Sequence, residues 1–343
     1  MRRTWTWSVL VAVIVTGVAL GVAIAPIDAQ QRNLVAKKVA VEPKLDGTLD
    51  TAWTAAPVTT VKVVGGKNLP GGSTEVAMRA LYTADSIYVM YQYKDATQSF
   101  QRSPWVKQAD GSWAMLKDPE DKGGDNNKYY EDKFAVLWNI SSPAFEQRGC
   151  GSACHTGEGK PYGNKYTATA GERLDMWHVK SVRTAVSVGQ TDDGYVDNTR
   201  YEQGKNDNAG RKTDPKTVGG YVDNQTADKK GPKFALKGNK PAPPYWILDA
   251  EKEPFDDSKY KAGDEVPGII VAPFAGDRGD VPTTMVWKDG VWTLVLKRKL
   301  VTGSEFDVQF DDLKKPYAFG VAVFDNAQVR HAYSPGALKL VFE

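Results

Sequence analysis

The sequence predicts an all-β protein folded as an antiparallel β-sandwich. Two observations lead to this fold class: apolar side chains alternate with polar ones in several short segments rich in β-branched and aromatic residues, and helical periodicity is scarce. A chain of 343 residues can also bury a large core without disulfide bonds. The expected strands are Glu75–Tyr82, Ser86–Lys94, Lys133–Ile140, Val291–Arg298, Tyr317–Phe324 and Ala337–Phe342.

The dipeptide Asp289–Gly290 predicts a tight β-hairpin. It interrupts the alternating stretch TTMVWKDGVWTLVL, which runs from Thr283 to Leu296. A two-residue type I′ turn needs positive φ at both central positions, and Asp-Gly is one of the dipeptides that supplies it. We therefore expect two antiparallel strands on either side of this turn.

Two polar segments interrupt the strand pattern, at residues 97–129 and 189–264. The first is polar with scattered Trp, and the second is dense in Gly, Asn, Asp, Lys and Pro. We expect both to be long insertions in the sandwich that dock a partner subunit or mediate assembly, because long loops commonly carry interfaces. The second contains GYVDN twice, which favours turns, with calcium ligation as the alternative. The residues concerned are Asp197, Asn198, Asp223 and Asn224.

The N-terminus has the form of a secretory signal at residues 1–29. Arg2 and Arg3 precede an apolar run at 9–25, and Ala29 offers a small residue for cleavage. The alternative is an uncleaved anchor, because the apolar run is nearly long enough to span a bilayer. We expect an exported, periplasmic protein that is membrane-associated only if this segment is retained. The formal net charge of +2 gives no support to a nucleic-acid partner.

Both cysteines of the chain lie in one short motif, and a histidine follows the second. Cys150, Cys154 and His155 form C-x-x-x-C-H, one residue longer than the C-x-x-C-H motif of c-type haem attachment. In such a motif two thiols add to the haem vinyl groups and the adjacent imidazole binds the iron. The alternatives are a short-range disulfide and a zinc site, although zinc needs four ligands and only two other histidines exist. The motif predicts one covalently attached haem c.

A resemblance to a known family extends beyond this motif. The haem-binding domain related to the gamma subunit of ethylbenzene dehydrogenase has a c-type branch in which C-x-x-x-C-H recurs. This chain resembles that branch in GCGSACHTGEG, in DMWHVKSVRT (Asp175–Thr184) and in TDDGYVDN. The opening KLDGTLDTAW (Lys44–Trp53) is similar to the start of that domain and of the related family 9 carbohydrate-binding modules. The resemblance covers residues 40–343.

The resemblance implies an immunoglobulin-like antiparallel β-sandwich with long polar loop insertions that holds one haem. In this group, the type II DMSO reductase family, the gamma subunit exchanges electrons with a molybdenum-containing catalytic subunit through an iron–sulfur subunit. The covalent motif and the large polar insertion make the chain look most like the gamma subunits associated with nitrite oxidoreductase. The implied partners are iron–sulfur and molybdenum-cofactor subunits, with a soluble cytochrome c as a further candidate.

The resemblance also implies a second axial ligand. Members with b-type haem hold it with a Met and a Lys, the Lys lying in a K-x-x-S context ahead of the last strand. In this chain His331 stands three residues before Ser334 in the corresponding stretch. The expected iron ligands are therefore His155 and His331. The alternatives to His331 are His178, Met176 and Met285.

The segment DMWHVK is expected to line the haem. If it is extended, Met176, His178 and Lys180 point to one side, and Trp177 points to the other. The resemblance implies that Trp177 packs near the porphyrin and that Lys180 or Arg183 neutralises a propionate. The alternatives are that Trp177 belongs to the sandwich core and that the two cations lie on a solvated strand face.

Two main function classes fit these residues. In the first, the protein is a monohaem electron-transfer subunit without substrate chemistry of its own, because two protein ligands leave no open position on the iron. In the second, it is a carbohydrate-binding module whose aromatic side chains stack on sugars. Cys150, Cys154 and His155 favour electron transfer, since a sugar-binding module has no use for them. A catalytic haem enzyme would require that His331 does not bind iron.

Overall fold

The computed structural model describes residues 33–122, 124–154 and 165–343. The expected signal segment at 1–29 and His155 therefore lie outside the described residues. Within the described part of the chain, no helix is both long enough and apolar enough to span a bilayer. Residues 31–343 form one compact unit.

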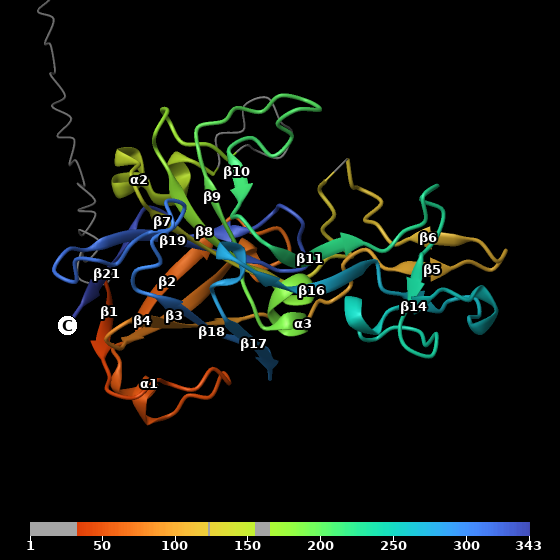
Figure 1. The fold of residues 1–343 in the computed structure, drawn as a ribbon, viewed down its shortest axis with the longest axis horizontal. Helices are drawn as coiled ribbons and strands as arrows, with labels where there is room; N and C mark the ends of the chain where they lie inside the picture. Colours follow the sequence, from red (N-terminus) through yellow and green to blue (C-terminus); the bar gives the residue numbers. More distant parts are fainter. Residues whose placement is uncertain (1–32, 123, 155–164) are drawn as a thin grey trace, which may run out of the picture. The chain divides into compact units, whose positions relative to one another are not determined.

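One large mixed sheet dominates the fold (Figure 1). Its path runs β10 (Arg211–Thr213), β9 (Asp192–Val196), β8 (Leu174–Lys180), β7 (Lys133–Asn139), β19 (Tyr317–Phe324), β20 (Ala332–Tyr333), β2 (Thr59–Val64), β3 (Ser73–Tyr82), β4 (Ser86–Lys94), β18 (Val291–Lys299) and β17 (Thr283–Lys288). Two further strands branch from this path, β1 (Asn33–Lys38) and β21 (Leu338–Phe342).

The two halves of this sheet face each other across one apolar core. Rings from β4 contact a ring from β7: the Tyr91 and Phe134 centroids lie 4.7 Å apart, and those of Tyr93 and Phe134 lie 5.7 Å apart. Trp138 and Trp177, from β7 and β8, are fully buried in the same core. Facing layers with a shared core make a β-sandwich, so the fold class expected from the sequence is confirmed.

The expected strands and the hairpin are also found. Each of the six strands expected from alternation overlaps a strand of the main sheet. Asp289 and Gly290 join β17 to β18 with φ of 52° and 78°, as a type I′ turn requires. The strands are not all antiparallel, because β1 pairs in parallel with both β21 and β3. Strand β1 thus joins the last strand of the chain to the middle of the sheet.

The two polar segments pack against each other and share a small apolar core. Strand β5 (Trp105–Lys107) pairs with β6 (Trp113–Met115) and with β15 (Glu265–Val266). The rings of Phe255 and Tyr260 lie against Trp113, with centroids 5.2 and 5.5 Å away. Segment 189–264 also supplies β9 and β10 to the main sheet. The remaining strands of this region are β11 (Val218–Asp223), β12 (Phe234–Ala235), β13 (Ile247–Leu248), β14 (Glu253–Pro254) and β16 (Ile269–Ala275).

Helices are short and few in the described residues. They comprise α1 (Thr51–Ala55), α2 (Pro143–Arg148), α3 (Val186–Val188), a π-helical turn η4 (Ser181–Ala185), and the 3-10 turns η2 (Pro70–Gly72), η3 (Gly149–Ser152), η5 (Asp249–Glu251), η6 (Asp257–Lys259) and η7 (Asp277–Gly279). The connection from α2 to η3 places the cysteine motif against the outer face of the sandwich, on β19.

Candidate functional site

Strands β7, β8 and β19 form a floor of small side chains on the face that points away from the core. Their register aligns Ala322 with Ala135 and then with His178, and in the next row Gly320 with Leu137 and then with Met176. Ala135, Gly320 and Ala322 fill three of these six positions, and the longer side chains of Leu137, Met176 and His178 fill the other three. A flat, hollow surface therefore lies between the cysteine motif and His178.

The cysteine motif is held over this floor by one helical turn. The Cys150 carbonyl accepts from the Cys154 amide at 2.9 Å, so both thiols point to the same side of the turn. Cys150 is buried against Gly320, where an added Cβ would stand 2.7 Å from the Cys150 Sγ. A larger residue than glycine in β19 would thus displace the thiol. Neither cysteine forms a disulfide.

Both thiols line one cavity together with two of the three histidines. Its walls are Ala135, Leu137, Cys150, Cys154, Lys165, Met176, His178, Gly320, Ala322, Phe324 and His331. Cys154 and Lys165 are the residues on either side of the undescribed segment 155–164. The cavity encloses about 40 Å³, which is room for a few waters. The predicted residues Cys150, Cys154 and His331 are therefore brought together by the fold.

Hydrogen bonds distinguish the two described histidines. His331 Nδ1 lies 2.8 Å from the Val329 carbonyl oxygen, an acceptor, so Nδ1 carries the proton and Nε2 keeps a lone pair. His178 Nδ1 instead accepts from Arg211 at 3.2 Å, which places the proton on Nε2. A metal-binding histidine usually donates its other ring N–H to a carbonyl or carboxylate. The arrangement of His331 therefore suits a metal ligand, and that of His178 does not.

Neighbouring groups shift the acidity of the thiols and of His178. A hydrogen bond to Cys154 and burial raise the pKa of Cys150 well above its usual range, and the same hydrogen bond lowers the pKa of Cys154. Cys154 is thus the thiol that ionises more readily and the stronger nucleophile at neutral pH. Burial, helped by nearby Lys180 and Arg211, lowers the pKa of His178 well below its usual value. This ring stays neutral at pH 7.

Comparisons with known proteins identify the family. The model of the ethylbenzene dehydrogenase family matches residues 50–335. The chain belongs to that family. A search of curated proteins found no match. Among solved structures, a family 9 carbohydrate-binding module from Caldicellulosiruptor kristjanssonii bound to cellotriose is 8% identical and has a TM-score of 0.35, over 91% of this chain and 94% of that one.

A second similar structure is a putative carbohydrate-binding protein from Bacteroides uniformis. It is 13% identical, with a TM-score of 0.36 over 91% of this chain and 99% of that one. We draw no conclusion from similarities this low.

Two cations, the buried Lys133 and the half-buried Arg211, flank the cavity of this ethylbenzene dehydrogenase family member, and sequence reasoning missed both. Lys133 lies 4.1 Å from the ring centre of Phe324 and donates to the Gln328 carbonyl at 2.8 Å. Arg211 donates to His178, and its Nε has no hydrogen-bond partner. Within the described residues, neither cation has a carboxylate within ion-pair distance. Both could neutralise an anionic group bound at this end of the cavity.

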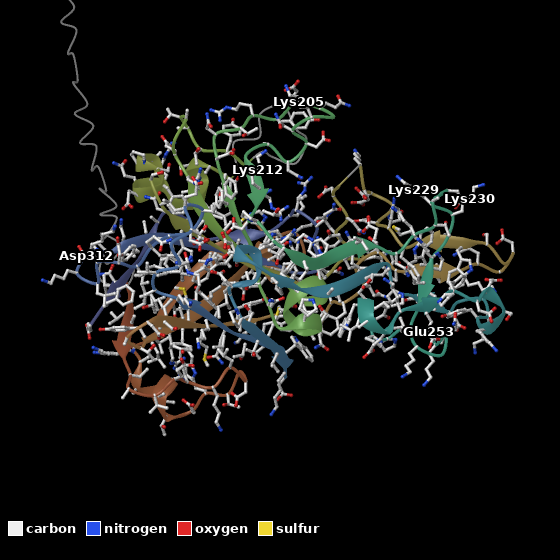
Figure 2. All side chains as sticks on the ribbon, in the orientation of Figure 1. Lys205, Lys212, Lys229, Lys230, Glu253 and Asp312 are labelled. Atoms are coloured by element: carbon white, nitrogen blue, oxygen red, sulfur yellow. The ribbon has the colours of Figure 1, made fainter. Side chains whose placement is uncertain are left out.

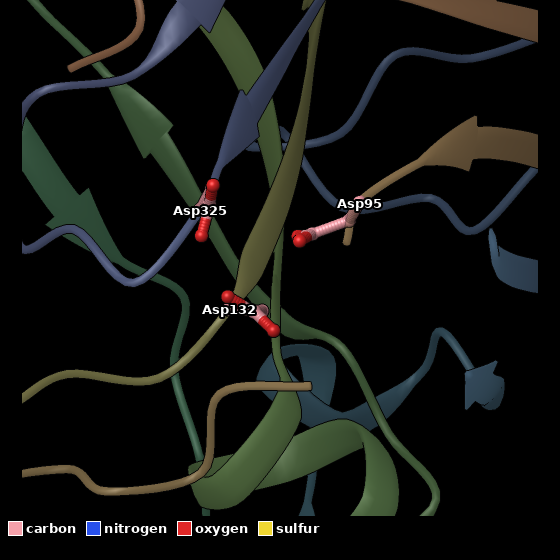
Figure 3. A group of neighbouring side chains, drawn as sticks. All are labelled: Asp95, Asp132 and Asp325. Carbon is pink, nitrogen blue, oxygen red and sulfur yellow. The ribbon is translucent and has the colours of Figure 1, made fainter. Parts of the chain in front are cut away.

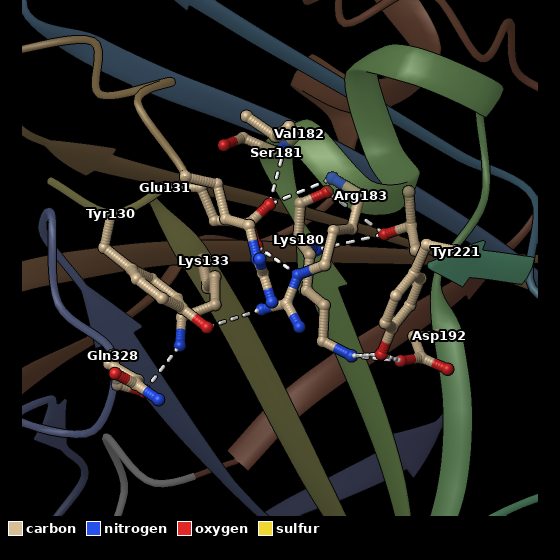
Figure 4. A network of polar contacts seen from close by, with 12 residues as sticks. Tyr130, Glu131, Lys133, Lys180, Ser181, Val182, Arg183, Asp192, Tyr221 and Gln328 are labelled. Carbon is tan, nitrogen blue, oxygen red and sulfur yellow. Dashed lines mark hydrogen bonds and ion pairs between the residues drawn. The ribbon is translucent and has the colours of Figure 1, made fainter. Parts of the chain in front are cut away.

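Lys180 and Arg183, the cations expected beside a propionate, already have carboxylate partners (Figure 4). Lys180 pairs with Asp192, and Arg183 pairs with Glu131. Tyr221 donates to the same Asp192 carboxylate at 2.8 Å. Although burial opposes ionisation, the nearby cations hold the pKa of Asp192 well below its usual range. The structure therefore places these two cations in an internally balanced network rather than on the walls of the cavity.

The other predicted residues fall on either side of β8. Met176 lines the cavity with His178, whereas Trp177 lies on the opposite face, in the core. Met285 is also in the core, on β17. The expected alternation along β8 is thus confirmed, but the packing of Trp177 is that of a core residue and it does not line the cavity.

The four residues weighed as calcium ligands do not converge. Asp197 Oδ1 accepts from the Thr199 amide at 2.8 Å, which is an Asx turn. Asp223 pairs with Arg102, and both ends of the Asn224 side chain bond to backbone groups. Asn198 follows Asp197 in the same turn. These residues shape turns at the ends of β9 and β11.

Proposed function

We propose that this chain is an exported monohaem c-type cytochrome and the electron-transfer, gamma-type subunit of a molybdenum enzyme complex such as nitrite oxidoreductase. One observation carries the proposal: two thiols and an imidazole with a lone pair on Nε2 converge on one cavity above a floor of alanine and glycine. Membership of the ethylbenzene dehydrogenase family supports the subunit role.

The set of donor side chains around the cavity fits haem c, provided that the cavity widens when the haem is bound. Cys150 and Cys154 would form the two thioethers, and His155 and His331 would bind the iron. Lys133 and Arg211 would neutralise the propionates, since a buried carboxylate needs a cationic partner. A porphyrin needs far more space than about 40 Å³, so the walls over the floor would stand further out in the haem-bound protein. When bound, haem would supply one-electron transfer.

Residues of this chain would set the environment for that electron transfer. Ala135, Gly320 and Ala322 leave room for a flat ring, and Phe324 keeps water from its edge. The Val329 carbonyl fixes the orientation of His331. Two protein ligands leave no open position on the iron, so the chain would relay electrons between an iron–sulfur subunit and an acceptor in the periplasm without substrate chemistry.

The alternative of a carbohydrate-binding module finds little support in the surface. Such modules stack sugars on exposed aromatic rings. In the described residues, no Trp, Tyr or Phe side chain is exposed. The aromatic residues of the described chain are therefore used for packing.

Covalent attachment is tested on the exported protein. Acid–acetone extraction of denatured wild type should leave haem on the chain, detected by peroxidase staining of a gel, and the pyridine haemochrome spectrum should be that of haem c. Cys150→Ala with Cys154→Ala should abolish staining. A matched control is Ser152→Ala, which changes the same turn and should retain the haem. Complete extraction of haem from the wild type would refute covalent attachment.

The ligand assignment is tested by a pair of variants. His331→Ala should open one coordination position, shift the iron toward high spin and allow carbon monoxide to bind the reduced protein, with the covalent haem retained. His178→Ala should leave the iron six-coordinate and low-spin, because its Nε2 carries a proton. If the two variants give the opposite results, His178 is the ligand and His331 is not.

A further inference from the structure

A second cluster of side chains lies on the other face of β8. Asp175 from β8, Asp193 from β9 and Asp307 from the segment after β18 each place one carboxylate oxygen within 4.8 Å of the others. None of the three side chains is more than 2% exposed. Asp175 shares its face of the strand with Trp177, so this cluster is separated by the sheet from the cavity that holds Met176 and His178.

Each carboxylate of this cluster is anchored through one oxygen and has the other free. Asp175 Oδ2 accepts from the Val308 amide at 3.0 Å, Asp193 Oδ1 accepts from the Gly194 amide at 2.8 Å, and Asp307 Oδ2 accepts from Thr302 at 2.6 Å. The second oxygens, Asp175 Oδ1, Asp193 Oδ2 and Asp307 Oδ1, are buried and have no hydrogen-bond donor. Hydrogen bonds from neighbouring groups orient metal ligands in the same way: they hold one oxygen of a carboxylate and leave the other directed at a common centre.

An independent residue points to the same centre. Asp214, which follows β10, is 2% exposed, and neither of its carboxylate oxygens has a hydrogen-bond partner. It lies beside Asp307 and Asp175, whose charges act on it. Asp280, which follows η7, adds a further unpartnered Oδ1 beside Asp193. A buried carboxylate oxygen without a partner is unfavourable unless a cation or a proton occupies the space next to it.

The positive charge available in the protein does not balance this cluster. Arg298 is fully buried and donates to Asp175 at 2.9 Å, with Asp307 3.8 Å away. In the described part of the chain no other Lys, Arg or His forms an ion pair with any of the five aspartates. Burial and mutual repulsion raise the pKa of Asp175 to about 8 and that of Asp214 to about 9. Without a cation, burial and repulsion thus favour the protonated, neutral form of these carboxyl groups.

We propose that Asp175, Asp193, Asp214 and Asp307 bind a divalent cation of the calcium class, with Asp280 as a fifth ligand. All donors are carboxylate oxygens, and hard oxygen donors select calcium or magnesium over zinc and copper, which take nitrogen or sulfur. Calcium accepts six to eight oxygens in flexible geometry, whereas magnesium keeps several waters. A buried cluster of five carboxylates therefore suits calcium better.

The cation would tie together four parts of the chain that are distant in sequence. It joins β8 and β9 to the segments after β10 and β18, and Asp280 adds the end of η7. Because β8 carries the cavity residues on its opposite face, the bound cation would hold the floor of that cavity in register. The site is structural, and its existence does not depend on whether haem is present.

The test uses the full exported chain. After treatment with EGTA and removal of the chelator, calcium should rebind at about one ion per chain by mass spectrometry of metals and by titration calorimetry. Calcium at 100 times its Kd should raise the thermal midpoint by roughly 4 °C, and magnesium should raise it less. Asp193→Asn and Asp214→Asn should lose this rise, whereas Asp197→Asn, which follows the other end of β9 and lies outside the cluster, should keep it.

Two outcomes overturn the proposal. If the wild type binds no calcium and its midpoint is unchanged, the aspartates share protons instead, and Asp214→Asn then stabilises the chelated protein with no further effect of the ion. If calcium binds but Asp197→Asn loses the rise while Asp193→Asn keeps it, the site lies elsewhere. Should Asp193→Asn fail to fold, Asp214→Asn and the metal content of the wild type still decide the question.

Discussion

Gly149 and Gly151 flank Cys150, and the structure predicts opposite effects of changing them to alanine. Gly149 has φ of 53°, where an L-residue is strained, and an added Cβ would stand 2.6 Å from the backbone of Gly336. Positive φ costs about 1–3 kcal/mol and forced overpacking about as much, so Gly149→Ala should lower the free energy of unfolding by about 2–6 kcal/mol. Gly151 has no atom within 4 Å of its added Cβ. Gly151→Ala should change stability by at most about +1 kcal/mol.

The assay is urea unfolding followed by circular dichroism. With a denaturant slope of about 3 kcal/mol/M, the midpoint of Gly149→Ala should fall by roughly 0.7–2 M, while that of Gly151→Ala stays within a few tenths of 1 M. Gly336 follows β20, which begins directly after His331, so Gly149→Ala should also loosen the contact between the cysteine turn and the segment after β20. Equal midpoints for the two variants would refute the close backbone contact between Gly149 and Gly336.

Three further predictions concern charged residues. Burial raises the pKa of Asp95, one of the three aspartates shown in Figure 3, to about 6. Between pH 4 and 6 the folded state therefore holds a proton that the unfolded state has released, and the free energy of unfolding should fall by up to about 3 kcal/mol as the pH rises from 4 to 7. Asp95→Asn should remove that fall in urea titrations at different pH values. Arg211→Gln should lower the reduction potential of the proposed haem in a spectroelectrochemical titration, because a cation favours the reduced form; an unchanged potential would place the propionates elsewhere. Lys229 and Lys230 project from the second polar segment (Figure 2). Changing both to Glu should weaken binding to an iron–sulfur subunit on gel filtration, whereas Lys314→Glu should leave binding unchanged. If the double variant and Lys314→Glu bind equally well, the second polar segment is not part of the interface.

The sequence predicts much of the fold because alternation and turn chemistry are local. The strands with one polar face and the Asp289–Gly290 hairpin follow directly from these patterns. Strand β8 was not among the expected strands, because its sequence LDMWHVK does not alternate and its charged residues Asp175 and Lys180, which look like surface residues, are buried. Parallel pairing by β1 was also beyond sequence reasoning, because nothing in residues 33–38 specifies a partner at the other end of the chain.

The candidate site was predictable only where its residues are adjacent in sequence. The spacing of Cys150 and Cys154 identified the motif, and a resemblance pointed to His331. Lys133, Arg211 and the buried aspartates had no signal, because they come from separate strands and connections and each looks like an ordinary surface charge. Their roles depend on register between strands that are far apart in the chain.

The pairing of β1 with β21 has a consequence for the order in which the protein can be completed. Residues 33–35 find their strand partners at residues 339–341, so the sheet stays open until the chain has been synthesised almost to its end. The thiols of Cys150 and Cys154 emerge well before β19, whose Gly320 later covers Cys150. The cavity of the folded protein is too small for a haem. Attachment of the proposed haem to these thiols would therefore take place during export, before β19 is in place.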